Sequence, residues 1–233
     1  MFVIGHRGAA GCEPENTLRA LRKGIECAPF VEVDVRLSRD GVPVIMHDAT
    51  VDRTTNGIGR VRELDLATLR MFDAGKGEQV PTLEEVLSAA KGRCGLVIEL
   101  KEPEGNSPVF DLIARTTDTT IWIVSFHDQA LKEAKDALPH ISRGLIFSRV
   151  DPTTIERAIT IQAKMIFPEF SLLTPLMVRE AHHQHLLVVP WTLNHEREVR
   201  MALQRQADGF VTDNPCWGKK VMVSLERASG NLE

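Results

Sequence analysis

The sequence has few cysteines, no long apolar run and no surplus of positive charge. Its four cysteines are scattered and form no CxxC pair, which argues against a zinc knuckle and favours reduced thiols. The net charge of −4 provides no electrostatic footprint for nucleic acid. No apolar stretch approaches membrane-spanning length, and the opening MFVIGHRG lacks the basic segment and apolar run of a signal peptide. We therefore expect a cytoplasmic protein with no nucleic-acid partner and no stable membrane insertion.

Apolar runs typical of strands alternate with segments of helical periodicity along all 233 residues. The strands are predicted at 2–4, 31–37, 96–100, 120–124, 143–147, 165–170, 186–191 and 209–212. The helices are predicted at 15–27, 83–90, 109–115, 129–138, 152–161, 174–183 and 196–206. Eight strands in this alternation favour one closed α/β domain over residues 1–233, a (β/α)₈ TIM barrel. An open doubly wound sheet is the competitor, but it usually carries a GxGxxG turn, which is missing after the first strand.

Residues 49–77 interrupt this alternation with a segment too long for an ordinary connection. The segment has a short helical pattern of its own, made by Leu64, Leu66, Leu69 and Met71. It predicts a small insertion on the face where the barrel strands end, either a lid or a simple surface elaboration. The polar residues 226–233 are expected to fray.

The stretch 31–48, VEVDVRLSRDGVPVIMHD, carries acids in an alternating pattern. Side chains two residues apart on a strand share a face, so Glu32 and Asp34 are predicted to lie side by side, roughly 7 Å apart along the strand. Two such carboxylates repel unless a cation lies between them or one of them is protonated. A turn and a second apolar run then lead to His47 and Asp48.

In a barrel of this kind, the active site forms at the carboxyl ends of the strands. The polar residues predicted there include His6, Arg7, Glu32, Asp34, Glu99, Lys101, Glu169 and Trp191. Three carboxylates without a cysteine suit Mg²⁺ or Ca²⁺ better than zinc. A cation together with an arginine and a lysine suits a phosphate group. Two histidines can act as an acid and a base during transfer at that phosphate.

Five motifs in order resemble the glycerophosphodiester phosphodiesterase family, in its cytosolic bacterial and archaeal form. They are HRGAAGCEPENT at 6–17, EVDVRLSRDGVPVIMHD at 32–48, ELK at 99–101, WTLN at 191–194 and VTDNP at 211–215. The resemblance spans about residues 2–217. It implies a TIM barrel of the PLC-like phosphodiesterase type with a small insertion after the second strand unit. It also implies metal-dependent hydrolysis of glycerophosphodiesters to sn-glycerol 3-phosphate and an alcohol, with Mg²⁺ or Ca²⁺ as the cofactor.

The resemblance also implies a role for each matching position. Glu32, Asp34 and Glu99 would bind the metal, and His6 and His47 would be the general acid and base. Arg7 and Lys101 would hold phosphate oxygens, and Trp191 would line the glycerol pocket. Glu15 and Asn16, from the PENT signature, would organise the site from its first loop. The chain departs from the family at His185, where glycine is usual.

Two other functions stay open from the sequence. One is a phosphodiesterase of the lysophospholipase D type, which acts on lipids and would need an apolar rim around its site. The other is a non-catalytic ligand-binding barrel, which would be expected to have lost one of the acids or histidines. The attacking group also stays open, because either water or the glycerol 2-hydroxyl, through a cyclic phosphate, fits the same residues. The sequence specifies no oligomeric state.

Overall fold

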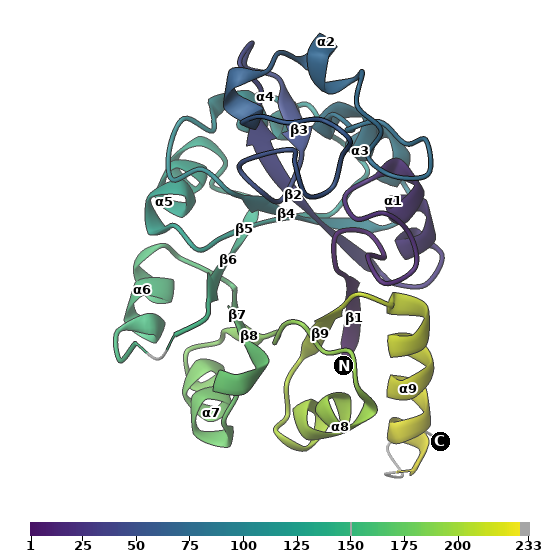
Figure 1. Ribbon diagram of the computed structural model, residues 1–233. Helices are drawn as coiled ribbons and strands as arrows, with labels where there is room; N and C mark the ends of the chain where they lie inside the picture. The colour runs from purple at the N-terminus through teal and green to yellow at the C-terminus, as the bar shows by residue number, and fades with distance from the viewer. Residues whose placement is uncertain (150, 229–233) are drawn as a thin grey trace.

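In the described part of the chain, eight parallel strands curve around a central axis, and helices cover their outer side (Figure 1). The computed structural model describes residues 1–149 and 151–228. The barrel strands are β1 (Phe2–Gly5), β2 (Phe30–Leu37), β4 (Gly95–Leu100), β5 (Ile121–Ser125), β6 (Ser142–Phe147), β7 (Met165–Pro168), β8 (Leu187–Val188) and β9 (Gly209–Thr212). They pair in the order β8-β7-β6-β5-β4-β2-β1-β9. The predicted (β/α)₈ TIM barrel is confirmed, and the open doubly wound sheet is excluded.

The barrel is nearly closed between its first and last paired strands. The strand predicted at 186–191 is regular only over Leu187–Val188, but its continuation still reaches β9. Val211 N donates to Pro190 O at 3.0 Å, and Leu193 N donates to Val211 O at 2.8 Å. These backbone hydrogen bonds satisfy polar groups that an open edge would expose.

The outer helices bury one face against the strands. They are α1 (Leu18–Ile25), α3 (Leu83–Ala90), α4 (Ser107–Ala114), α5 (Asp128–Ala137), α6 (Thr154–Thr160), α7 (Pro175–His183), α8 (Glu196–Gln204) and α9 (Pro215–Ala228), with a short 3₁₀ turn, η2, at Phe170–Leu172. The bounds of α3 match the prediction, because Thr82 and Glu85 form a capping box that fixes its first turn. Helix α1 begins three residues later than predicted. Thr17 caps it by accepting a hydrogen bond from Ala20 N, which leaves the preceding PENT residues in a loop.

Helix α9 was not predicted from the sequence. It packs along β1 and β9, and Gly218 permits the approach, since a Cβ there would lie 2.9 Å from the Thr212 Cγ2. The helix includes 226–228, which were predicted as part of a fraying tail, while 229–233 lie outside the described residues. Within 1–149 and 151–228, none of the helices combines the length and apolar character that crossing a bilayer requires.

The barrel interior changes from apolar to charged along its axis. Phe30 and Trp122 stack at the amino ends of β2 and β5, with ring centroids 4.0 Å apart, and Phe2 meets the Trp122 ring edge-on at 5.7 Å. Gly95 leaves space for this cluster, because a Cβ there would lie 2.3 Å from the Phe30 ring. A layer of buried aliphatic side chains follows, including Val97 on β4. The next inward positions on β2 and β4 are carboxylates. The interior of the barrel is therefore apolar at the amino ends of the strands and charged at their carboxyl ends.

Residues 49–77 form a small unit beside β2, and they share a core with Val44, Met46 and Val80. Just before this unit, β3 (Pro43–Ile45) pairs antiparallel with β2. The unit itself contains the 3₁₀ turn η1 (Val61–Glu63) and the helix α2 (Leu66–Leu69). Val51, Val61 and Leu69 are fully buried in this unit. We call residues 49–77 the insertion. This shared core holds the turns of the insertion in place.

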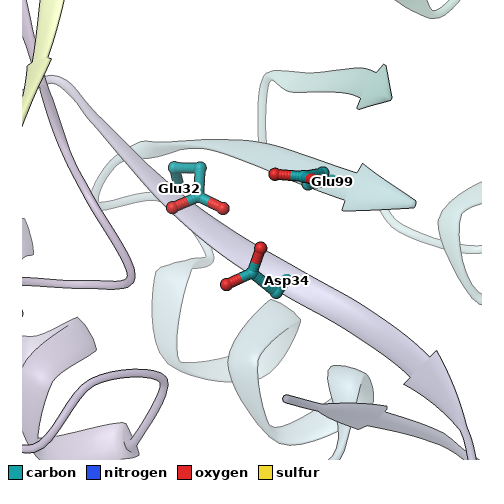
Figure 2. Close-up of side chains that lie close together, drawn as sticks. All are labelled: Glu32, Asp34 and Glu99. Atoms are coloured by element: carbon teal, nitrogen blue, oxygen red, sulfur yellow. The ribbon is translucent and has the colours of Figure 1, made fainter. Parts of the chain in front are cut away.

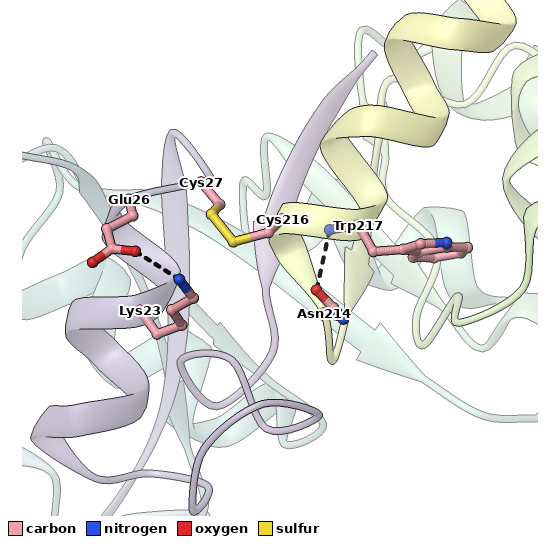
Figure 3. Close-up of a disulfide and its surroundings, with 6 residues drawn as sticks. All are labelled: Lys23, Glu26, Cys27, Asn214, Cys216 and Trp217. Atoms are coloured by element: carbon pink, nitrogen blue, oxygen red, sulfur yellow. Dashed lines mark hydrogen bonds and ion pairs between the residues drawn. A yellow bond between two sulfur atoms is a disulfide. The ribbon is translucent and has the colours of Figure 1, made fainter.

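Two of the four cysteines form a disulfide, so the expectation of four reduced thiols is wrong. Cys27, after α1, is bonded to Cys216 in the first turn of α9, at a sequence separation of 189 (Figure 3). Cys12 and Cys94 are free thiols. The two bonded cysteines have no motif spacing, and only the packing of α9 against the first βα unit brings their Cα atoms to 4.8 Å.

Candidate active site

Three carboxylates meet at the carboxyl ends of β2 and β4. Glu32 and Asp34 are two residues apart on β2, and the parallel pairing puts Asp34 opposite Glu99 on β4. All three are buried, and one oxygen from each lies within 4.8 Å of the others (Figure 2). We call Glu32, Asp34 and Glu99 the acidic triad. The alternation of the β2 side chains produces the first pair, and the register of β2 with β4 adds the third member.

Two cations partly balance the acidic triad. Lys101 Nζ lies 2.5 Å from Glu99 Oε1 and 2.9 Å from Asp34 Oδ1, and Arg7 Nε lies 3.4 Å from Asp34 Oδ2. Burial opposes ionisation of Asp34, but Lys101 and Arg7 hold its pKa below the usual range. Burial and the charge of Asp34 raise the pKa of Glu99 to about 7. The same effects, with the charge of Glu99, raise the pKa of Glu32 well above its usual value.

The free oxygens of the acidic triad fit a metal ion. Within the described part of the chain, the buried Glu32 Oε1 accepts no hydrogen bond, whereas Asp34 Oδ1 has the Lys101 ammonium 2.9 Å away. A buried carboxylate oxygen without a donor is costly, and a cation between the carboxylates would remove that cost and favour their charged forms. The donor set consists of oxygens alone, which suits a hard divalent ion.

The first loop reaches the triad through an unusual backbone. Arg7 has φ +46° and Gly8 has φ +87°, both in the left-handed region. A Cβ at Gly8 would lie 2.5 Å from the Ala20 carbonyl carbon in α1, so this position requires glycine. The turn aims Arg7 N at Glu32 Oε2, to which it donates at 2.7 Å. The HRG motif therefore supplies both a backbone donor and a guanidinium to the site.

The PENT residues hold the arginine and the triad in place. Glu15 Oε1 accepts a hydrogen bond from Arg7 Nη1 at 2.8 Å. Asn16 Nδ2 donates to Asp34 Oδ2 at 2.7 Å from a residue with φ +58°, a conformation that asparagine tolerates. Neither side chain reaches into the pocket described below, so both act by orienting Arg7 and Asp34.

His6, at the end of β1, is oriented by a carboxylate. Its Nδ1 lies 2.6 Å from Asp213 Oδ1, and Asn194 Nδ2 donates to the other oxygen of Asp213 at 2.5 Å. Burial opposes ionisation of Asp213, but the His6 contact keeps its pKa low. An ionised carboxylate only accepts hydrogen bonds, so the His6 proton lies on Nδ1 and Nε2 remains for chemistry.

His47, which follows β3, is also oriented by a carboxylate. Its Nδ1 lies 2.6 Å from Asp48 Oδ1, and Arg53, from the insertion, donates through Nε to Asp48 Oδ2 at 2.6 Å. The Arg53 hydrogen bond, followed by that of His47, holds the pKa of Asp48 far below its usual value. Burial lowers the pKa of His47. Each histidine thus keeps one ring nitrogen uncommitted.

Both histidines line one pocket at the barrel mouth. Its walls are His6, Arg7, Glu32, His47, Val97, Glu99, Lys101, Val124, Phe126, Ile146, Phe167, Trp191 and Val211. One side is therefore charged and the other apolar. Trp191 is fixed by a hydrogen bond from its Nε1 to Phe167 O at 2.9 Å, and its ring meets Phe126 edge-on at 5.8 Å between centroids.

Comparison with known proteins identifies the family. Residues 6–216 match the Glycerophosphoryl diester phosphodiesterase family. The chain belongs to this family. A glycerophosphodiester phosphodiesterase from Caldanaerobacter subterraneus is 31% identical, over 98% of this chain and 99% of that protein. The resemblance seen in the sequence, and with it the expectation of a phosphodiesterase, is confirmed at the level of the family.

Solved structures of the family agree with the fold. An Oleispira antarctica phosphodiesterase in complex with the product sn-glycerol-3-phosphate has a TM-score of 0.92 at 30% identity, with 96% of this chain and 97% of that chain covered. A glycerophosphodiester phosphodiesterase from Agrobacterium tumefaciens has a TM-score of 0.81 at 26% identity, with 96% and 99% covered.

The barrel of this phosphodiesterase brings all the predicted site residues to one end, and it adds four to which the sequence analysis assigned no role. These are Asp48, Arg53, Phe126 and Asp213. Two of them had a signal, since Asp48 follows His47 directly and Asp213 lies in the VTDNP motif. Arg53 and Phe126 had none, because their roles depend on contacts with distant segments.

Two other positions lie outside the pocket. Glu169, expected at the mouth, is not among the pocket walls, and its Oε1 accepts a hydrogen bond from Ser171 Oγ at 3.2 Å. His185 has φ +58°, a left-handed conformation that glycine adopts without strain.

Proposed function

We propose that this chain hydrolyses glycerophosphodiesters to sn-glycerol 3-phosphate and an alcohol, with a divalent cation on the acidic triad and with His6 and His47 as general acid and base. The observation that carries the proposal is one pocket lined by His6 and His47, each oriented by an aspartate, and by Glu32 and Glu99, which belong to the buried acidic triad. A structural relative, described as a complex with the product sn-glycerol-3-phosphate, agrees with it.

The pocket has a place for each part of such a substrate. Arg7 and Lys101 border the charged side and would hold the phosphate oxygens, while Trp191 would contact the carbon skeleton of glycerol on the apolar side. Arg7 is held by Glu15 and Lys101 by Glu99, so their charges are positioned before the substrate arrives. Preorganised charges of this kind stabilise the negative charge that builds up during phosphoryl transfer.

The two histidines would move the protons. One accepts the proton of the attacking oxygen through its free Nε2, and the other donates a proton to the leaving alkoxide. The contacts to Asp48 and Asp213 stabilise whichever imidazole is positively charged at that moment. The attacking oxygen belongs either to water or to the glycerol 2-hydroxyl, which would form a cyclic phosphate.

The acidic triad would hold Mg²⁺ or Ca²⁺, which supplies Lewis-acid stabilisation of the phosphate oxygens. The residues of this chain prepare that site in two ways. Asn16 and Arg7 keep Asp34 and Glu32 in place by hydrogen bonds, and the Lys101 charge favours the ionised forms of its two acidic neighbours.

The test is the release of sn-glycerol 3-phosphate from glycerophosphocholine. Product should appear with Mg²⁺ or Ca²⁺, disappear after chelation, and return when the cation is added back in excess. An enzyme that is equally active in chelator would contradict the metal requirement. A protein that releases no product from any of a panel of glycerophosphodiesters would contradict the function and favour a non-catalytic barrel.

The lipid alternative has less support. Of the four apolar residues expected for a rim, Leu69 is buried and Leu64 and Leu66 pack in the core of the insertion, which leaves only Met71 exposed. Release of choline from lysophosphatidylcholine, measured beside glycerophosphocholine, compares the two activities.

The cytoplasmic location stays a prediction, and the disulfide counts against it because such bonds persist mainly in oxidising compartments.

A further inference from the structure

The insertion contributes one charged residue, Arg53, beside the site. Arg53 lies between two carboxylates that serve different parts of the machinery. Toward Glu15, its Nη1 donates to Oε2 at 2.9 Å and its Nη2 to Oε1 at 2.8 Å. Toward Asp48, its Nε donates to Oδ2 at 2.6 Å. One planar guanidinium therefore bridges both acids, a geometry that its fork of donors permits and a lysine ammonium does not.

Each carboxylate held by Arg53 has a second partner in the pocket. Glu15 also binds Arg7, which is expected to hold the phosphate, and Asp48 also binds His47, an expected acid or base. The side chains thus form a continuous chain of charge in the order Arg7, Glu15, Arg53, Asp48 and His47. Arg53 is the link, because Glu15 comes from the first loop and Asp48 from the segment after β3.

The backbone around Arg53 is fixed by the insertion itself. Val51 is buried in the core of the insertion, and its N donates to Gly59 O at 3.0 Å. Thr55 N and Oγ1 both bond to Val51 O, at 3.0 and 2.9 Å, which closes a turn around Arg53. Although about half of the Arg53 side chain is exposed, its base is therefore held at one place beside the pocket.

We propose that Arg53 is a positioning residue that ties the phosphate-binding Arg7–Glu15 pair to the proton-transferring His47–Asp48 pair. The inference rests on the proposed function. Arg53 is not among the walls of the pocket and so acts through its two carboxylates. The insertion is then neither a lid nor a surface elaboration but a structural part of the active site.

The first experiment compares Arg53→Ala and Arg53→Lys with the wild type on glycerophosphocholine. Arg53→Ala should lower kcat roughly 10- to 100-fold, because misplaced catalytic groups cost about this much, while KM changes less. Arg53→Lys should recover only part of the loss, since it reaches one carboxylate at a time. Full recovery of kcat in Arg53→Lys would show that a positive charge alone is sufficient, and it would contradict the bridging role of Arg53. The matched control is Arg60→Ala, an exposed arginine of the same insertion that contacts Glu63 at 4.0 Å, and it should keep kcat within about 2-fold.

A double-mutant cycle tests whether Arg53 acts through Asp48. In an Asp48→Asn background, Arg53→Ala should cost much less than it does in the wild type, because the link is already broken. Equal fold-losses in the two backgrounds would overturn the proposal. Circular dichroism and thermal unfolding of each variant verify that the loss is not general unfolding.

A readout without turnover separates this proposal from the proposed function. In ¹⁵N NMR, His47 of the wild type should carry its proton on Nδ1, and Arg53→Ala should shift that tautomer balance while Arg60→Ala does not. An unchanged His47 spectrum in Arg53→Ala would refute the positioning role even if the enzyme were inactive on every substrate. Conversely, a shifted His47 spectrum in a protein without phosphodiesterase activity would refute the proposed function and support the positioning role of Arg53.

Discussion

Breaking the Cys27–Cys216 disulfide should destabilise the fold strongly, because the bond closes almost the whole chain into a loop. At a sequence separation of 189, the chain-entropy relation gives about 5 kcal/mol of stabilisation at 25 °C. For a domain of this length, such a loss lowers the unfolding temperature by about 10–20 °C. The double variant Cys27→Ser/Cys216→Ser should therefore unfold at a much lower urea concentration than the wild type.

Thiol titration and urea unfolding check this prediction. Unreduced, denatured wild type should show two reactive thiols, from Cys12 and Cys94, and reduced protein should show four. Cys12→Ser is the matched control and should change stability by less than about 0.5 kcal/mol. Four reactive thiols in the unreduced protein would refute the reasoning. A double variant as stable as Cys12→Ser would refute it as well.

Three further predictions concern the site. Glu32→Gln should abolish calorimetric binding of Mg²⁺ or Ca²⁺ together with activity; unchanged binding would remove Glu32 from the ligand set. His47→Ala should lower turnover by roughly 10²–10⁴-fold with folding retained, and near-normal turnover would exclude it as acid or base. Metal affinity should rise as pH increases from about 6 to 8, because burial beside Asp34 raises the pKa of Glu99 to about 7 and only its deprotonated form ligates. Calorimetry over that pH range measures the affinity, and a flat profile would contradict the prediction.

Most of the barrel could be predicted from the sequence because its strands are short apolar runs separated by amphipathic helices. The predictions failed where a local pattern was ambiguous. Residues 15–17 look helical but form a loop, since Thr17 caps α1 and Asn16 bonds to Asp34. Helix α9 was missed because residues 215–225 were assigned no element and 226–228 were predicted as part of a polar tail; the helix packs against β1 and β9.

The site residues also divide into those that a local pattern predicted and those that it did not. The period of two along β2 was enough to put Glu32 and Asp34 on one face. Nothing local pairs β2 with β4 and so puts Glu99 opposite Asp34, because β3 lies between them in the chain. The partners of the histidines divide likewise, since Asp48 is a sequence neighbour of His47 whereas Asp213 is 207 residues from His6.

Residue spacing and identity were enough to predict most of the strands and helices, the acidic face of β2 and the family motifs. The three-dimensional arrangement was needed to show that Arg53 joins Glu15 to Asp48, that Cys27 meets Cys216, and that Asp213 orients His6. Closing the barrel brings together residues far apart in the chain, and such proximity leaves no trace in local periodicity.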